Sequence, residues 1–267
     1  MRDTVKILTG ADLLFLMLLI WSGAFSGVLS RIVYLLAFLV PILFAILASK
    51  KKFLSLEYIL PVRNIPIASA SVFPSVALVA ALATLSSLVL GLIGKSNTPN
   101  LGDSLAVALL VHALLPATLE ELLFRYIPLR ICKGGNSGAL VLISALFFAL
   151  SHHSFFSFGY AFLAGCIFMA LDLVCESVIP SMVIHLFNNA LSVLLMFYSQ
   201  NTALTLVLWI SVGVLSLLSL VFLFLKRKEL FALIRERVIS GEKYRLSYEI
   251  LFLLIPSLVI AVLEIAG

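Results

Sequence analysis

Charged residues are scarce in this sequence. Asp, Glu, Lys and Arg make up 12% of its 267 residues, and hydrophobic residues make up 63%. A soluble domain carries about 25% charged residues, so this chain lacks the charge to cover a water-exposed surface of its size. That shortage excludes a soluble enzyme and a disordered chain, and it predicts an integral membrane protein.

Cysteines are also few. Cys132, Cys166 and Cys175 lie in or beside apolar stretches and show no metal-type spacing. Their number and placement exclude a secreted disulfide scaffold and give no support to a cysteine-bound cofactor. The net charge of +5 would suggest nucleic acid in a soluble protein. In a membrane protein the same excess reflects cytosolic loops rich in Lys and Arg, so we expect no nucleic-acid partner.

Long apolar runs, in contrast, are abundant. A helix needs about 20 apolar residues to cross the hydrocarbon core. Two of the nine candidate runs, 138–154 and 157–175, are short and could be tilted, re-entrant or partly fused. We therefore predict an all-α, polytopic transmembrane helix bundle of eight helices, with nine as the alternative, that forms a single membrane domain over residues 1–267. The runs are 11–29, 32–49, 67–93, 104–127, 138–154, 157–175, 178–198, 203–225 and 249–266.

Lys and Arg predict the orientation. With the N-terminus in the cytosol and the spans alternating, 16 of the 18 Lys and Arg residues fall on the cytosolic side, and only Arg31 and Lys95 do not. This asymmetry favours a cytosolic N-terminus. The stretch 226–248 mixes these charges with Leu230, Phe231, Leu233 and Ile234. It could form an interfacial amphipathic helix or a solvated loop.

The informative residues are the polar ones inside apolar spans. A charged side chain at mid-bilayer costs at least about 2.5–3.5 kcal/mol, so it needs a partner or a cavity. Twelve residues qualify, and they include all four histidines of the chain. They are His112, Glu120, Glu121, Arg125, His152, His153, Asp172, Glu176, His185, Asn188, Asn189 and Glu264.

Two adjacent carboxylates form the first group. On a helix, Glu121 and Arg125 are i,i+4 neighbours, so Arg125 can neutralise Glu121. Glu120 points about 100° away on the helix, so Arg125 does not neutralise it. An unpaired carboxylate in apolar surroundings can serve as a general base or acid. Pro116 cannot donate to the carbonyl of His112, so we expect a kink just before the carboxylates.

A histidine at the end of the next run forms the second group. The stretch Gly134-Gly135-Asn136-Ser137-Gly138 is a turn signal, and Asn136 lies sixteen residues from both Glu120 and His152. In an antiparallel hairpin folded there, the two side chains lie at the same depth, about 24 Å from the turn. We therefore expect Glu120 and His152 to meet.

The third group is His185 and Asn189, which share one face of a helix. Both can donate hydrogen bonds to a developing oxyanion, or they can join two membrane helices. By simple alternation His185 lies nearer the cytosol than His152. A shared site then requires the stretch 154–178 to be irregular or the helices to tilt.

Four other polar residues are interpreted as interfacial or structural rather than catalytic. Asp172 and Glu176 are like charges on one helix face, which favours an interfacial position, with a role in lining substrate entry as the alternative. His112 and His153 belong to no pattern and are expected to be structural.

These groups, taken in order, resemble the signatures of the CPBP family of intramembrane proteases. That family includes type II CAAX prenyl endopeptidases of the Rce1 kind and bacteriocin-processing or immunity (Abi) proteins. Its patterns EExxxR, FxxxH and HxxxN appear as Glu120-Glu121…Arg125, Phe148…His152 and His185…Asn189. The similarity covers about residues 100–195, which we take as the protease-like core.

The resemblance implies a role for each residue. Glu120 and His152 would activate water to attack a peptide carbonyl, His185 and Asn189 would stabilise the oxyanion, and Glu121 and Arg125 would support the helix. The family has been described both as metalloproteases and as glutamate proteases. Glu120, His152 and His185 could bind a divalent ion such as zinc, or act without metal. The sequence has no HExxH motif, so no cofactor is assigned.

The leading hypothesis is an intramembrane endopeptidase acting on a peptide or protein at the lipid bilayer. The alternatives are a non-catalytic membrane immunity or scaffold protein that retains the fold and, with less support, a proton-coupled transporter. We see no inverted repeat of the kind that many transporters carry. The compact chain suits a bacterial or archaeal plasma membrane.

Overall fold

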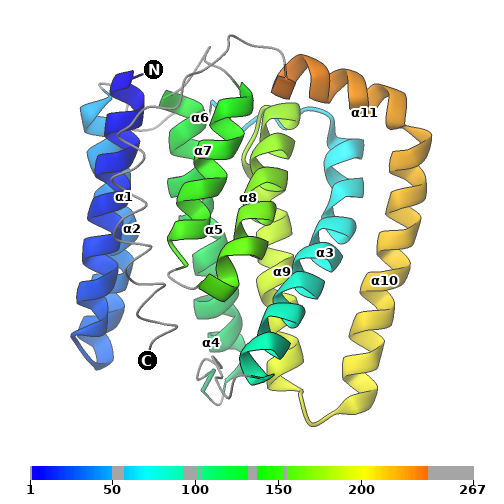
Figure 1. Cartoon of the computed structure of the whole chain (residues 1–267). Helices are drawn as coiled ribbons and strands as arrows, with labels where there is room; N and C mark the ends of the chain where they lie inside the picture. Colours follow the sequence, from blue (N-terminus) through cyan, green and yellow to red (C-terminus); the bar gives the residue numbers. More distant parts are fainter. Residues whose placement is uncertain are drawn as a thin grey trace.

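The computed structural model describes residues 2–49, 57–92, 101–102, 104–131, 137–152 and 155–239. Within these ranges the regular structure is entirely helical (Figure 1). Among the described residues, seven helices are long and apolar enough to cross a membrane, and Ser137–Leu150 is a shorter apolar helix. The predicted all-α membrane bundle is therefore confirmed. The predicted run 249–266, with Glu264, lies outside the described residues.

Helices α1 (Arg2–Gly23) and α2 (Gly27–Ala48) form an antiparallel pair at one side of the bundle (Figure 1). The ring of Phe15 lies 4.9 Å from that of Phe38 on α2 and 5.6 Å from that of Phe124 in the central helix. The predicted first span, 11–29, is wrong at both ends. The reversal between the helices comes earlier, because Ser26 has an extended backbone at the N-cap of α2.

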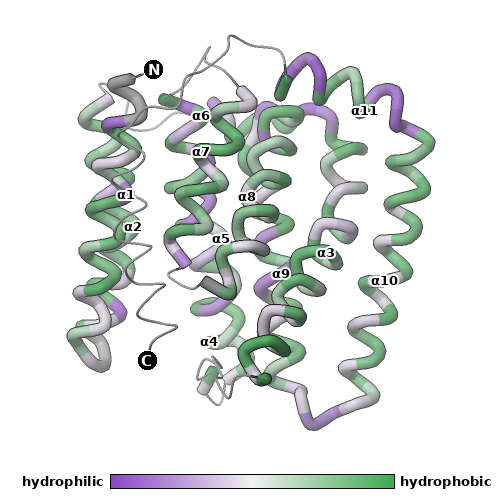
Figure 2. Tube along the Cα trace, viewed as in Figure 1, coloured by the Kyte–Doolittle hydropathy of each residue, from purple (hydrophilic) through white to green (hydrophobic). Residues whose placement is uncertain are grey.

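Helix α3 (Ile65–Leu92) packs against α8 (Phe155–Cys175), α9 (Ile179–Phe197) and α10 (Thr202–Leu225). Only 6% of the apolar segment of α10 is buried inside the protein. Figure 2 shows this helix as hydrophobic along most of its length. An exposed helix of this composition faces lipid.

The central helix spans residues 105–131 and is interrupted twice by π-helical turns. It consists of α4 (Leu105–Leu109), a π turn at Leu110–Leu114, α5 (Leu115–Glu121), a π turn at Leu122–Tyr126 and α6 (Ile127–Ile131). A proline stands second after each π turn, at Pro116 and Pro128. Since proline has no N–H to donate, the regular α-helical ladder is broken at both places. The predicted kink before the carboxylates thus corresponds to a π turn.

Helix α7 (Ser137–Leu150) packs against the second π turn and α6, as the predicted hairpin requires. Its Ser144 hydroxyl donates to the carbonyl of Phe124 at 2.5 Å, which is the carbonyl that Pro128 cannot serve. Helix α7 also packs closely on α8, where a Cβ on Gly165 would lie 2.7 Å from the Cα of Ala145. The chain leaves α7 part-way through the bundle, and His152 follows in a turn (Figure 1).

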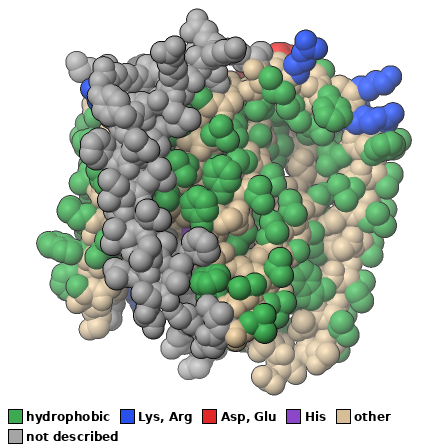
Figure 3. Space-filling model, in the orientation of Figure 1, with side chains coloured by type: hydrophobic (Ala, Val, Ile, Leu, Met, Phe, Trp, Pro, Cys, Tyr) green, Lys and Arg blue, Asp and Glu red, His purple; other side chains and the backbone are tan. Residues whose placement is uncertain are grey.

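Helix α11 (Arg227–Ile234) and a π turn at Arg235–Ile239 lie across the end of the bundle where the N-terminus lies (Figure 1). Of the two interpretations of 226–248, the helix is therefore correct up to Ile239, and 240–248 lie outside the described residues. Figure 3 shows Lys and Arg side chains gathered at this end.

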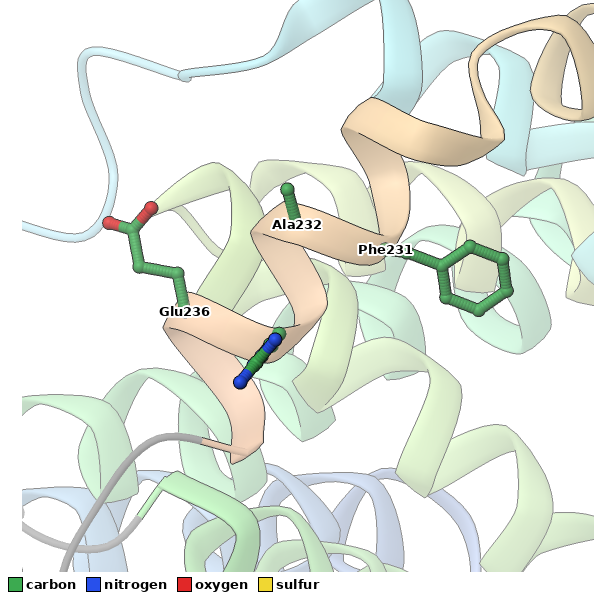
Figure 4. A pocket seen from close by; sticks show the side chains of 4 residues that line it. Phe231, Ala232 and Glu236 are labelled. Atoms are coloured by element: carbon green, nitrogen blue, oxygen red, sulfur yellow. The ribbon is translucent and has the colours of Figure 1, made fainter.

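The outer surface of α11 is amphipathic. Phe231 is 67% exposed and lines an open pocket with Ala232, Arg235 and Glu236 (Figure 4). Arg237 pairs with Glu176, which follows α8, at 2.6 Å. This contact ties the helix to the turn that precedes α9.

Candidate active site

Glu120 and Glu121 lie at the end of α5, directly before the second π turn. Such turns are frequent at functional sites, because they rotate the following side chains away from regular helical positions. Helix α5 packs against α9 and α2, so both carboxylates lie between helices that are distant in the sequence.

Glu121 and Arg125 form a buried ion pair. Arg125 Nε lies 3.1 Å from Glu121 Oε2, and both side chains are fully buried. The guanidinium also stacks over the Phe148 ring at 3.9 Å from its centroid. A planar cation against an aromatic face is stabilised electrostatically, so Phe148 supports the pair from α7. The predicted i,i+4 contact is present.

Glu121 has a second partner that the sequence did not indicate. Its Oε1 lies 2.7 Å from His185 Nδ1 on α9. A carboxylate beside Arg125 accepts hydrogen bonds, so Nδ1 carries the proton. The neutral ring then presents the lone pair of Nε2 on its other side. Glu121 therefore fixes both the orientation and the tautomer of His185.

Glu120 lies on the other side of this histidine. Its Oε2 is 3.9 Å from His185 Nε2, which is too long for a direct hydrogen bond but leaves both atoms within reach of one shared water. Glu120 also interacts electrostatically with Tyr34 on α2, with His152 and with Tyr160 on α8. Its side chain is 16% exposed, so it is largely enclosed.

His152 joins the same cluster from α7. Its Nδ1 lies 2.8 Å from the carbonyl of Phe148, which can only accept, so Nε2 is again the nitrogen with a lone pair. The Phe148 ring lies 4.8 Å from the His152 ring and 5.7 Å from the His185 ring. The two histidines therefore share one aromatic neighbour. The chain that connects them contains a continuous helix, α8, over Phe155–Cys175, so this helix is not the irregular stretch considered in the sequence analysis.

Asn189 lies one turn after His185 on α9. Its Oδ1 accepts a long hydrogen bond, 3.4 Å, from Asn188 Nδ2, which leaves its own Nδ2 able to donate. No hydrogen bond joins Asn189 to Glu120 or His152 in the described part of the chain. The structure thus brings Glu120, Glu121, Arg125, His152 and His185 together, whereas Asn189 is joined to them only through its place one turn after His185 on α9.

A metal ion would have one carboxylate and two imidazole Nε2 atoms as its donors here, a set that suits zinc chemically. Across the residues that the structure describes, however, no three His, Cys, Asp or Glu side chains are grouped as a metal site. The metal option for Glu120, His152 and His185 therefore stays a prediction, and no step below passes through a metal.

Asp172 was expected at the interface together with Glu176. Glu176 is partly exposed and pairs with Arg63 and Arg237, as that expectation requires. For Asp172 the expectation is wrong, since the side chain is fully buried and hydrogen-bonded to Ser181. An acidic residue in an apolar run was the only sign in the sequence that Asp172 has a specific role. The turn between α8 and α9 is what directs its side chain toward Ser181. His112 lies in the first π turn, and His153 is not described.

The family model of type II CAAX prenyl endopeptidase Rce1-like proteins matches residues 102–191. This stretch contains the whole cluster, from Glu120 to Asn189. The predicted resemblance to the CPBP family is confirmed over this stretch. Comparison with curated proteins and with solved structures gave no match. The CPBP match ends within α9, so α1 to α3, α10 and α11 lie outside it.

Proposed function

We propose that this CPBP protein is an intramembrane endopeptidase of the glutamate type that hydrolyses a peptide bond. The observation that carries the proposal is the Glu120 carboxylate, which faces the Nε2 of a histidine whose opposite nitrogen is held by Glu121. A base beside an oriented histidine is the arrangement that acid–base hydrolysis needs.

In this mechanism Glu120, assisted by His152, takes a proton from water as the water attacks the peptide carbonyl. The Nε2 lone pair of His152 is available because Nδ1 is occupied by the Phe148 carbonyl. Glu120 or His152 then returns the proton to the leaving amine. General acid–base catalysis of this kind contributes about 10²–10⁴-fold in rate.

His185 and Asn189 are assigned to the oxyanion that forms on the carbonyl. Asn189 donates through Nδ2. The neutral His185 ring described above accepts at Nε2, and it becomes a donor there only after Nε2 takes up a second proton, while Glu121 and Arg125 keep the ring in place. Donors fixed in advance stabilise the developing charge without reorganising.

The substrate is a peptide or protein segment that reaches the cluster from the membrane. The compact chain suits a bacterial or archaeal plasma membrane, where a leader peptide or another membrane protein would be cleaved.

The test is a peptide-library cleavage assay on the purified full-length chain in proteoliposomes, with and without a chelator. We expect cleavage that survives chelation and that is lost in His152→Ala, with thermal unfolding close to wild type. Ser216→Ala on the lipid-facing helix α10 is the control and should cleave normally. Cleavage retained by His152→Ala would contradict the mechanism, and cleavage abolished by the chelator would contradict the glutamate type.

A further inference from the structure

The position of His185 depends on where α9 begins. This helix starts at Ile179, only four residues after α8 ends at Cys175, and His185 follows within its second turn. The first turn of a helix has N–H groups without partners inside the helix, so it needs an external acceptor to stay fixed.

Asp172 on α8 supplies that acceptor. One oxygen of its carboxylate accepts the backbone N–H of Ser181 at 3.1 Å, and the other accepts the Ser181 hydroxyl at 2.7 Å. Ser181 is the third residue of α9, and both side chains are fully buried. The side chain of Asp172 therefore caps a neighbouring helix through hydrogen bonds to its first turn.

The backbone of Asp172 is itself held in place. Its carbonyl accepts the N–H of Ser177 at 3.1 Å, and Glu176, the residue directly before Ser177, has a φ of 50°. This six-to-one hydrogen bond around a left-handed residue is the Schellman arrangement that ends many helices. Asp172 thus acts from a rigid helix end.

Ser181 and His185 are four residues apart, so they lie on the same face of α9. Asp172 on α8 holds Ser181, and Glu121 on α5 holds His185. Two acidic side chains from different helices therefore form hydrogen bonds with successive turns on one face of α9. The first contact fixes where α9 begins, and the second fixes the ring that it carries.

We propose that Asp172 is a positioning residue for hydrolysis, which acts through Ser181 to set the register of α9 and hence the approach of His185 Nε2 to Glu120. This inference rests on the proposed peptidase function. A buried carboxylate is costly, and an apolar residue would pack there at least as well if packing were its only role.

The experiment measures kcat, KM and thermal unfolding for Asp172→Ala, Asp172→Asn, Ser181→Ala and the Asp172→Ala/Ser181→Ala double variant. Alanine removes both acceptors, whereas asparagine keeps one. We expect kcat to fall about 100-fold in Asp172→Ala and about 10-fold in Asp172→Asn, with KM little changed, because small misplacements near reacting groups cost this much.

Matched controls separate positioning from loss of stability. Asp12→Asn alters a buried carboxylate in α1, and Ser216→Ala removes a buried hydroxyl in α10; both should keep the wild-type kcat. The double variant should be no slower than Asp172→Ala, since removing the carboxyl group already removes both hydrogen bonds by which Asp172 holds Ser181. A wild-type kcat in Asp172→Ala, or kcat losses that multiply in the double variant, would overturn the proposal.

The peptidase proposal fails separately, if the wild-type chain cleaves no peptide. The contact is then still tested by thermal unfolding. Non-additive losses in the unfolding midpoint of the single and double variants support the Asp172–Ser181 contact, and additive losses overturn it.

Discussion

Replacing Arg125 by methionine tests the buried pair around which the site is built. Arg125 and Glu121 are fully buried at 3.1 Å, and the guanidinium stacks on Phe148. Methionine fills a similar volume but leaves the Glu121 carboxylate without its cation. Removing one partner of a buried pair costs about 3–5 kcal/mol. At about 2–4 °C per kcal/mol, we expect the unfolding midpoint in detergent to fall by about 10 °C.

The matched control is Arg227→Met, because Arg227 also stacks on a phenylalanine, Phe224, at 4.4 Å, but on an exposed surface. Its midpoint should stay within about 2 °C of wild type, since exposed charges contribute little. In the double variant Arg125→Met/Glu121→Gln the carboxylate no longer needs a cation, so much of the lost stability should return. An Arg125→Met midpoint equal to that of wild type would refute the reasoning.

Two further predictions concern the packing of α7. Ser144→Ala removes the hydroxyl that donates to the buried carbonyl of Phe124, so it should lower the free energy of unfolding by about 1–3 kcal/mol in a denaturation titration; an unchanged value would show that another group serves this carbonyl. Gly165→Ala places a Cβ 2.7 Å from the Cα of Ala145, so it should destabilise by about 1–3 kcal/mol. Gly159→Ala on the same helix has open space and should be neutral or stabilising by up to about 1 kcal/mol, and equal losses in the two variants would argue against close α7–α8 contact.

The fold was predictable where one property decided it. Apolar runs gave the positions of most spans to within a few residues, because the length of a crossing helix is set by the membrane. The first helix was misplaced because the turn at Ser26 lies in a run that stays apolar through Val28 and beyond. The π turns were not predicted, since Pro116 indicates that a helical hydrogen bond is missing but not which backbone geometry accommodates the loss.

The site was predictable where its residues are local in sequence or belong to family patterns. The Glu121–Arg125 pair follows from i,i+4 spacing, and the approach of Glu120 to His152 follows from a hairpin. The contacts from Glu121 to His185 and from Asp172 to Ser181 depend on how three helices meet. Spacing along one helix carries no information about such contacts, so Asp172 was assigned to the interface.

The most direct test of the central claim is the cleavage rate of Glu120→Gln, which keeps the shape of the side chain and removes the base. The variant should lose at least about 10²-fold in kcat while its unfolding midpoint stays close to wild type. The control is Glu229→Gln, which alters an exposed carboxylate paired with Lys226 and should cleave normally. A Glu120→Gln variant that cleaves at the wild-type rate would contradict the assignment of Glu120 as the base.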